Sequence, residues 1–348
     1  MYRDRIELYK KMEQEFGSKV LVYVTSDRRN LSAQIAQDAI DLFIRHLKKT
    51  GICKRLSLFL YTRGGDTAAA WNIVNLLKMY CDELQVIVPH KAHSAGTIIC
   101  LGANEIIMTK QATLSPIDPS ITTPLNPSLK NTGELIPISV EAVKGYLEFA
   151  KQELKIKEDD ALSKIYIKLS ESIHPLVIGE AYRSKDQIKM IAGKLLKQQI
   201  KNEDDIDQII NFLCSDSGGH DYTINRREAE YDLKLPVKKP TENQYKIIKA
   251  IYDDVSQELL FEEPFNPLLI NGAYAGRCSI LESLCGGADY FITEGKITRT
   301  KDDAGQITIS DSVTFRGWRH ENCMDDSIVE VKINEEGTKY ESSGEFQM

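Results

Sequence analysis

The sequence predicts an α/β protein whose main sheet is largely parallel. Two short runs, residues 56–61 and 84–89, are almost wholly apolar, and each precedes a segment with helical periodicity. Such runs are typical of strands buried on both faces. Strands separated by helices need crossover connections, which produce parallel pairing with helices on both faces of the sheet. At 348 residues the chain is long enough for two domains and a substantial core.

The N-terminal half alternates between the two element types. After the strand that ends at residue 61, apolar residues recur at helical spacing from Asp66, which suits the N-cap of that helix. The other elements expected here are helices over about 4–16, 31–49 and 95–103 and a strand over 19–24.

The C-terminal half changes in character. Residues 139–213 predict successive amphipathic helices, and two prolines with two lysines at 236–240 indicate a domain junction. A helix over about 242–260 and short strands around a hairpin turn at 301–305 are expected beyond it. We therefore divide the chain into an N-terminal helix (1–18), a main domain (19–239) with a helical extension (139–213), and an accessory region (240–348) without assignable chemistry.

Composition excludes several classes of protein. A net charge of −7, from 44 Lys and Arg against 51 Asp and Glu, argues against nucleic-acid binding. Seven scattered cysteines without a CxxC pair indicate reduced thiols and no zinc site, as in a cytoplasmic protein. No run is long and apolar enough for a membrane span, and the N-terminus lacks the apolar core of a signal peptide.

The pair Gly64-Gly65 follows the first buried run, and Ser94 stands 29 positions after Gly65. Glycine adopts positive φ cheaply and lets a substrate carbonyl approach the main-chain amides. Ser94 lies where a loop meets the start of a helix, where free amides and the positive end of the helix dipole face developing negative charge. This position suits a nucleophile, although a serine here is also a common helix cap.

Four segments in order resemble the serine dehydrogenase proteinase family. That family is grouped with signal peptide peptidase A and the Clp proteolytic subunit, which share the Clp/crotonase-type fold, a spiral of βαβ units. The interval from Gly65 to Ser94 matches that between oxyanion glycine and serine in the Clp subunit. The resemblance covers roughly residues 15–237. Its segments are Tyr61–Asp66, Val88–Thr97, Ala103–Met108 and Leu114–Pro119.

A further segment, residues 217–229, resembles the signature with which this family closes its catalytic domain. Two departures are visible. Arg63 stands where relatives have proline before the glycines, and residues 232–235 lack the expected glycine before leucine. The first departure affects how a substrate strand would bind beside the glycines, and the second weakens the closing turn.

The resemblance leaves the general base open, because Asp118 stands 24 positions after Ser94, where the Clp subunit has histidine. In one arrangement His220 is the base and Asp118 or Asp221 orients it, since a triad is defined by geometry and not by chain order. In the other, Lys144 deprotonates Ser94 as in the signal peptide peptidases. We favour His220, because imidazole titrates near neutrality, whereas Lys144 also fits the solvated edge of an amphipathic helix.

The sequence thus predicts a soluble, cytoplasmic serine peptidase that cleaves extended polypeptides through an acyl-enzyme on Ser94. The amides of Gly65 and Ala95 would hold the oxyanion, and Gly64, Gly65 and Gly96 would bind the substrate main chain. No cofactor or metal is implied, and by resemblance we expect a homo-oligomer. Two alternatives remain: a non-catalytic or partner-activated oligomeric scaffold, and a crotonase-type acyl-CoA enzyme.

Overall fold

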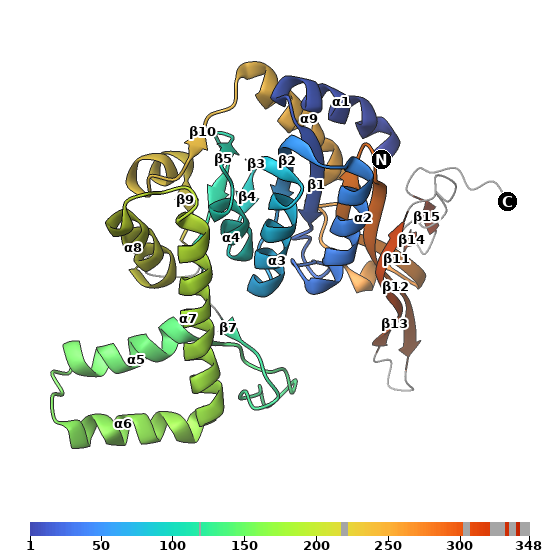
Figure 1. Cartoon of the computed structure of the whole chain (residues 1–348). Coiled ribbons are helices and arrows are strands. Elements are labelled where there is room, and N and C mark those ends of the chain that lie inside the picture. Colours follow the sequence, from blue (N-terminus) through green and yellow to red (C-terminus); the bar gives the residue numbers. More distant parts are fainter. Residues whose placement is uncertain (118–119, 217–221, 302–306, 321–330, 334–338, 342–348) are drawn as a thin grey trace. The chain divides into compact units, whose positions relative to one another are not determined.

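The computed structural model describes residues 1–117, 120–216, 222–301, 307–320, 331–333 and 339–341. The chain forms two compact units (Figure 1). The first comprises residues 1–113 and 236–348, and the second comprises residues 114–235. The predicted boundaries at 18/19 and 239/240 stay predictions.

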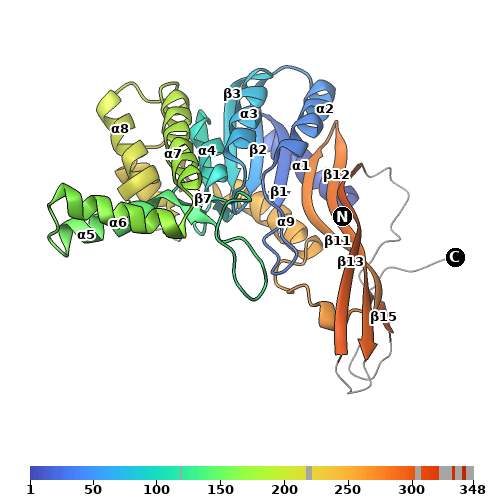
Figure 2. The same cartoon turned by 90° about the horizontal axis from the view of Figure 1, so that it is seen from below.

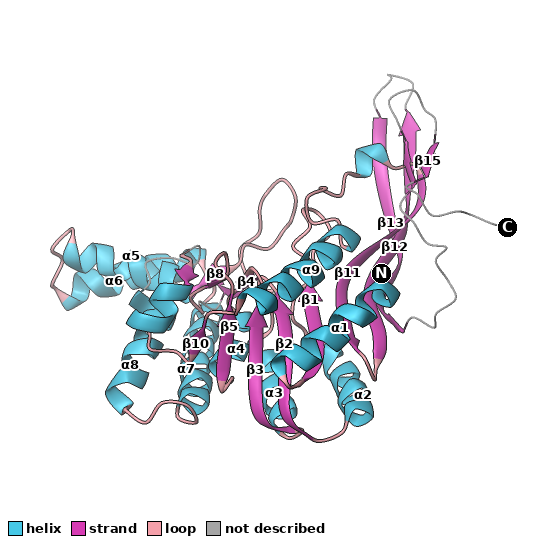
Figure 3. Ribbon diagram, turned by 90° about the horizontal axis from the view of Figure 1, so that it is seen from above, coloured by secondary structure: helices cyan, strands magenta, loops and turns pink. Residues whose placement is uncertain are grey.

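An eight-stranded sheet is the framework of the first unit (Figure 3). Its order is β10-β5-β3-β2-β1-β11-β12-β13; the strands from β10 to β1 are parallel, and those from β11 onward are antiparallel. This mixed sheet confirms the predicted α/β class. The strands are β1 (Lys19–Thr25), β2 (Cys53–Tyr61), β3 (Cys81–Val88), β5 (Glu105–Met108), β10 (Val237–Lys238), β11 (Gly272–Ser283), β12 (Gly287–Lys301) and β13 (Ile307–His320).

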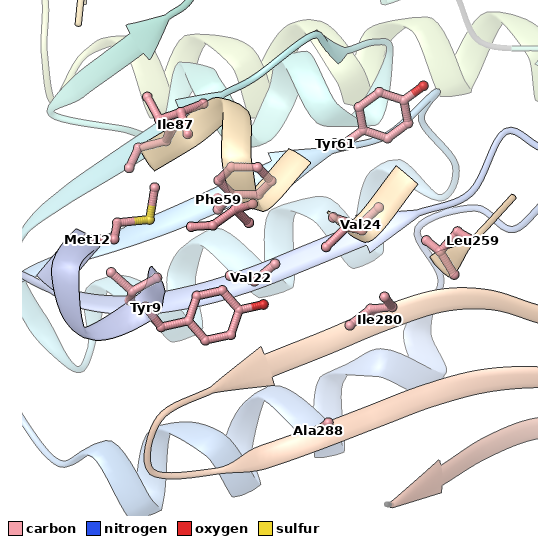
Figure 4. Close-up of a cluster of buried hydrophobic side chains, with 14 of the residues drawn as sticks. Tyr9, Met12, Val22, Val24, Phe59, Tyr61, Ile87, Leu259, Ile280 and Ala288 are labelled. Atoms are coloured by element: carbon pink, nitrogen blue, oxygen red, sulfur yellow. The ribbon is translucent and has the colours of Figure 1, made fainter. Parts of the chain in front are cut away.

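Helices cover both faces of this sheet, because successive side chains of a buried strand point in opposite directions. Val22 and Val24 of β1 pack with Tyr9 and Met12 of α1 (Figure 4). Tyr23 points the other way and meets Phe43 of α2, with ring centroids 5.1 Å apart. One face carries α1 (Tyr2–Phe16) and α9 (Glu242–Glu258), and the other carries α2 (Ile40–Thr50), α3 (Thr67–Lys78) and α4 (Ala95–Leu101) (Figure 3).

The prediction of a helix over 31–49 is wrong for the residues before Ile40. The helix α2 begins at Ile40, after a short 3₁₀ turn over Gln37–Ala39. The residues before it are extended, because Ile35 forms a parallel bridge with Gly65. These distant hydrogen bonds outweigh the local helical periodicity.

The C-terminal strands are much longer than the short runs expected from the sequence. The strand β11 pairs with β1 over residues 279–283, so the C-terminal region continues the central sheet. Part of the expected hairpin turn at 301–305 lies outside the described residues. A separate pair is formed by β14 (Val331–Ile333) and β15 (Lys339–Glu341).

The second unit is mainly helical, as expected for residues 139–213. Figure 2 labels its helices α5 to α8. The helix α6 (Asp159–Ser172) contains no buried residue, and Tyr166 and Ile167 on it are exposed. Across the described part of the chain, no helix has the length and apolarity that crossing a membrane requires. The elements of this unit are β7 (Ser120–Ile121), β8 (Ile138–Ser139), α5 (Val140–Gln152), α6 (Asp159–Ser172), α7 (Pro175–Leu196), α8 (Glu203–Asn211) and β9 (Ile224–Asn225), with π-helical turns at Phe212–Asp216 and Glu228–Asp232.

Candidate active site

The glycine pair forms a turn that begins three residues after the end of β2 at Tyr61. Gly64 has φ +117° and Gly65 has φ +144°, conformations that residues with a side chain rarely adopt. A β-carbon on Gly65 would also overlap the main chain of Ile35. Both positions therefore require glycine, as the sequence analysis expected for a turn that a substrate approaches closely.

Main-chain hydrogen bonds hold this turn on one side. The amide of Ile35 donates to the Gly64 carbonyl oxygen at 2.9 Å, and the Asp66 amide donates to the Ile35 oxygen at 2.8 Å. The Asp66 carboxylate accepts a hydrogen bond from the amide of Ala68 at 2.7 Å, which confirms Asp66 as the N-cap of α3. The turn is thus fixed between a paired segment and a capped helix.

Ser94 lies between the short strand β4 (Lys91–Ala92) and α4, in a strained conformation with φ 50° and ψ −113°. Although it occupies the N-cap position, its side chain makes no capping hydrogen bond to α4. The plain helix-cap interpretation therefore does not explain this serine. Strained non-glycine residues concentrate at functional sites, and a serine on a sharp strand-to-helix turn is the arrangement that exposes a nucleophile.

Gly64 and Gly96 allow the two turns to approach each other. A β-carbon on Gly64 would lie 2.8 Å from Ser94 Cβ and 3.3 Å from Ser94 Oγ. A β-carbon on Gly96 would lie 2.5 Å from Thr62 Cγ2. The chain after β2 and the start of α4 are therefore in contact, with Ser94 at the junction.

The amides of Gly65 and Ala95 have no hydrogen-bond acceptor among the described residues. Ala95 is the first residue of α4, where an amide has no partner inside the helix. The Gly64 amide differs, because it donates to Thr62 Oγ1 at 3.0 Å. Two of the amides near Ser94 are thus available to an incoming oxygen atom, and the Gly64 amide is not.

Five of the six histidines of the chain are described. His93 Nε2 lies 2.9 Å from the Thr113 hydroxyl oxygen in β6 (Thr113–Leu114). His90 stacks on Tyr252, and its burial, together with the charge of Lys91, lowers its pKa, so the ring is neutral at neutral pH. The other three are His174, which caps α7, and His46 and His320, which contact Asp289.

The remaining triad candidates, His220, Asp221 and Asp118, lie outside the described residues. Their predicted roles as base and acid stay predictions.

Lys144 lies on α5 of the second unit. Its side chain is 40% exposed, and its ammonium group lies 3.6 Å from the Glu148 carboxylate and 3.9 Å from the Glu141 carboxylate. These i,i+4 and i,i+3 pairs are what a lysine on the solvated edge of a helix forms. They account for Lys144 without a catalytic role, and its role as a base stays a prediction.

Residues that the sequence analysis did not single out also shape the site. Thr62 is fully buried and bonded to the glycine turn, and Asp27 accepts hydrogen bonds from Tyr61 at 3.0 Å and Lys91 at 2.6 Å. The sequence does contain a signal for such residues, because they are polar and follow apolar strands. Ligands of α/β proteins bind at the carboxyl ends of such strands.

Residues 32–135 match the family model of the ClpP-like SDH-type serine proteinases. The matched segment carries Gly64, Gly65, Ser94, Ala95 and Gly96. The resemblance predicted from the sequence is confirmed for this segment.

Two uncharacterized proteins of Methanocaldococcus jannaschii are similar to this chain. One is 30% identical over 191 residues, covering 54% of this chain and 56% of the relative. The other is 33% identical over 133 residues, covering 35% of this chain and 46% of the relative. The chain thus spans about half the length of these curated relatives.

Among solved structures, a mutant of the 1510-N membrane-bound stomatin-specific protease with a substrate peptide is similar over 65% of this chain and 78% of that chain, with 16% identity and a TM-score of 0.37. ClpP1 from Listeria monocytogenes is similar over 68% of this chain and 97% of that chain, with 12% identity and a TM-score of 0.35.

Proposed function

We propose that this protein is a serine peptidase in which Ser94 attacks the carbonyl carbon of a peptide bond. The observation that carries the proposal is the strained turn at Ser94, pressed against Gly64 inside the segment that matches ClpP-like serine proteinases. Such a conformation costs of order 1–3 kcal/mol and persists only because the surrounding structure holds it, and residues of this kind cluster at active sites.

The oxyanion of the tetrahedral intermediate would be held by the amides of Gly65 and Ala95. Both amides lack an acceptor among the described residues, and they flank the contact between Gly64 and Ser94. One such donor typically contributes about 2.7–4 kcal/mol to transition-state stabilisation. Gly64 contributes to substrate binding by its missing side chain, because its amide is already bonded to Thr62.

The proton of Ser94 would pass to His220, which returns it to the leaving amine, and water then releases the acyl group from the serine. Asp118 would orient the imidazole, with Asp221 as the alternative acid and Lys144 as the alternative base. The partners of the five described histidines support the choice of His220. A histidine base contributes roughly 10²–10⁴ in rate.

The substrate would be an extended polypeptide, bound mainly through its main chain beside the glycine turn. We also propose a homo-oligomer, supported by large apolar side chains exposed on the helices of the second unit. They include Tyr146 and Phe149 on α5, Tyr166 and Ile167 on α6, and Tyr182 on α7. The six cysteines that the structure describes are free thiols, which supports a cytoplasmic location.

A fluorophosphonate probe, which reacts with activated serines, tests the proposal on purified protein between about pH 5 and 9, a range that spans the titration of an ordinary histidine. We expect labelling of the wild type that disappears in Ser94→Ala and His220→Ala and survives in Lys144→Ala. Loss in Lys144→Ala with survival in His220→Ala would assign the base to the lysine instead.

A wild type that is folded and oligomeric yet unlabelled would contradict the peptidase and favour the scaffold. Binding of coenzyme A with turnover of an acyl thioester would favour the crotonase-type alternative.

A further inference from the structure

Thr62 contacts the glycine turn, the segment that leads to Ser94 and the start of α4. We propose that Thr62 is a positioning residue, which holds the glycine turn in register with the turn that carries Ser94. This inference rests on the proposed peptidase function. It assigns a role to a side chain that is fully buried behind Gly64 and Gly65.

The hydroxyl group of Thr62 holds the peptide plane before Gly64. Thr62 Oγ1 accepts a hydrogen bond from the Gly64 amide at 3.0 Å. Two consecutive glycines have more conformational freedom than any other pair of residues, so without an anchor the Gly65 amide would sample many directions. With the Gly64 amide directed at Thr62, the orientation of the next amide, the proposed oxyanion donor, is restricted.

A second buried threonine supports this anchor. The hydroxyl group of Thr25, at the end of β1, donates to Thr62 Oγ1 at 2.7 Å. Thr25 is itself fully buried. A hydroxyl oxygen has two acceptor sites, so Thr62 Oγ1 accepts from Thr25 with one and from Gly64 with the other.

The main chain of Thr62 fixes the segment that leads to Ser94. Its amide donates to the Lys91 carbonyl oxygen at 3.0 Å, and its carbonyl oxygen accepts from the His93 amide at 3.1 Å. Together these bonds form a parallel bridge between Thr62 and Ala92. Because Thr62 is hydrogen-bonded to Lys91 and His93, a shift of the glycine turn would also displace Ser94.

The methyl group of Thr62 sets how closely α4 approaches. Thr62 Cγ2 lies 2.5 Å from the point where a β-carbon on Gly96 would stand, so it rests on the bare Cα of that glycine. Hydroxyl, main chain and methyl thus contact the glycine turn, the serine turn and the helix start, respectively.

A residue that fixes both turns affects the rate, because catalysis requires precise positions of the reacting groups. Oxyanion donors and nucleophile must stay within about 0.5 Å of the productive arrangement. A displacement of about 1 Å, even from a distant change, can reduce the rate roughly 10²-fold. Thr62 acts through the Gly65 amide and Ser94, and its loss should therefore lower kcat more than it changes KM.

The test is the rate of fluorophosphonate labelling of Ser94, together with kcat and KM on a peptide substrate, in Thr62→Val. Valine keeps the shape of threonine but cannot accept from Gly64. We expect labelling and kcat to fall roughly 10- to 100-fold with KM within about threefold of wild type. Thr62→Ser, which keeps the acceptor, should retain most of the rate.

The matched control is Thr109→Val. Thr109 is also buried, and its hydroxyl group donates to the Pro89 carbonyl oxygen at 2.6 Å, but it bonds neither turn. We expect a comparable fall in thermal stability and a labelling rate within about twofold of wild type. Thr25→Val removes only the second donor and should give a smaller loss of rate than Thr62→Val.

The outcomes separate the two proposals. An unlabelled wild type would overturn the peptidase and this inference with it. A labelled wild type with Thr62→Val as reactive as Thr109→Val would overturn the positioning role alone. Should Thr62→Val not fold, Thr25→Val and Thr62→Ser decide the matter, and wild-type rates in Thr25→Val combined with a slow Thr62→Ser would contradict the role assigned to the hydroxyl group.

Discussion

Two serines of the first unit, Ser283 and Ser94, differ in their hydrogen bonds and backbone conformation. Ser283, at the end of β11, has Oγ 2.8 Å from His46 Nδ1, and His46 Nε2 lies 2.8 Å from Asp289 Oδ2. The Gly286 amide also donates to Ser283 Oγ, at 2.9 Å. Ser283, His46 and Asp289 thus have the hydrogen-bond order of a catalytic triad. Ser94 has no capping bond and is held in a strained conformation instead.

The two serines differ in whether a substrate can reach them. Ser283 is 2% exposed, and a β-carbon on Gly286 would overlap the His46 ring, so a substrate has no room. Asp289 also binds Arg45 and His320. Ser94 is half-buried, beside two amides that lack described acceptors. Hydrogen bonds alone therefore do not make a serine a nucleophile, because a reacting atom also needs space and oxyanion donors. We assign the Ser283 cluster to fastening α2 onto the hairpin of β11 and β12.

The largest effect expected from this comparison is the loss of reactivity in Ser94→Ala. Labelling should disappear, and peptide turnover should fall by roughly 10³-fold or more, because the nucleophile is removed. Fluorophosphonate labelling and peptide hydrolysis by the purified variant measure it. A folded Ser94→Ala protein that still labels, and stops doing so when Ser283 is also changed, would reverse the assignment of the two serines.

The second prediction concerns the oxyanion turn. Gly65→Ala should lower the labelling rate by about 10² or more, because a β-carbon would overlap Ile35 and move the amide. Gly51→Ala is the matched control, since Gly51 also has positive φ, +75°, but its β-carbon would meet nothing within 4 Å. The control should lose stability without losing reactivity. Equal labelling rates in the two variants would argue against a role for the Gly65 amide.

The third prediction concerns Asp289. Burial disfavours its charge, but hydrogen bonds from His46 and Arg45 outweigh this and hold its pKa below the ordinary value. Asp289 therefore contributes stability that is fully present above the unfolded pKa of about 3.9 and is lost as pH falls through the lower folded pKa. Asp289→Asn should destabilise the protein by roughly 2–3 kcal/mol at neutral pH and flatten the acid limb of urea-unfolding profiles.

Labelling of Ser94 in the folded Asp289→Asn protein should stay at the wild-type rate. A selective loss of labelling would connect the two regions functionally and contradict their separation.

The smallest effect is expected for Ser283→Ala. It leaves the Gly286 amide and one nitrogen of His46 without a partner in a buried site, which costs about 1–3 kcal/mol. Urea unfolding at neutral pH measures the loss. Turnover at a temperature where the variant is folded should match the wild type, and an abolished activity there would assign Ser283 a role beyond stability.

Local chemistry explains what could be predicted around the site. Gly64 and Gly65 are needed for a turn with positive φ, and Asp66 was recognised as a cap because its carboxylate satisfies amides two and three residues ahead. The parallel strands could be predicted because a short, almost wholly apolar run is typical of a strand that is buried on both faces. These features depend on neighbours in the sequence.

The features that could not be predicted from the sequence depend on contacts between distant residues. The segment before the 3₁₀ turn at Gln37–Ala39 was expected to be helical but is extended around Ile35, because Ile35 bonds to the glycine turn. The strand β11 joins the central sheet only through its pairing with β1, about 250 residues earlier in the chain. Neither interaction leaves a local signature.

The sequence by itself determined the α/β class, the two turns and the serine between β4 and α4, since glycine conformations, caps and apolar runs are local properties. Only the tertiary structure decided that Ser94 is strained, that Thr62 links the two turns, and that the Ser–His–Asp arrangement at Ser283 is closed. The strain at Ser94, the contacts of Thr62 and the burial of Ser283 depend on which distant segments pack together. That packing depends on the core as a whole and not on neighbours in the sequence.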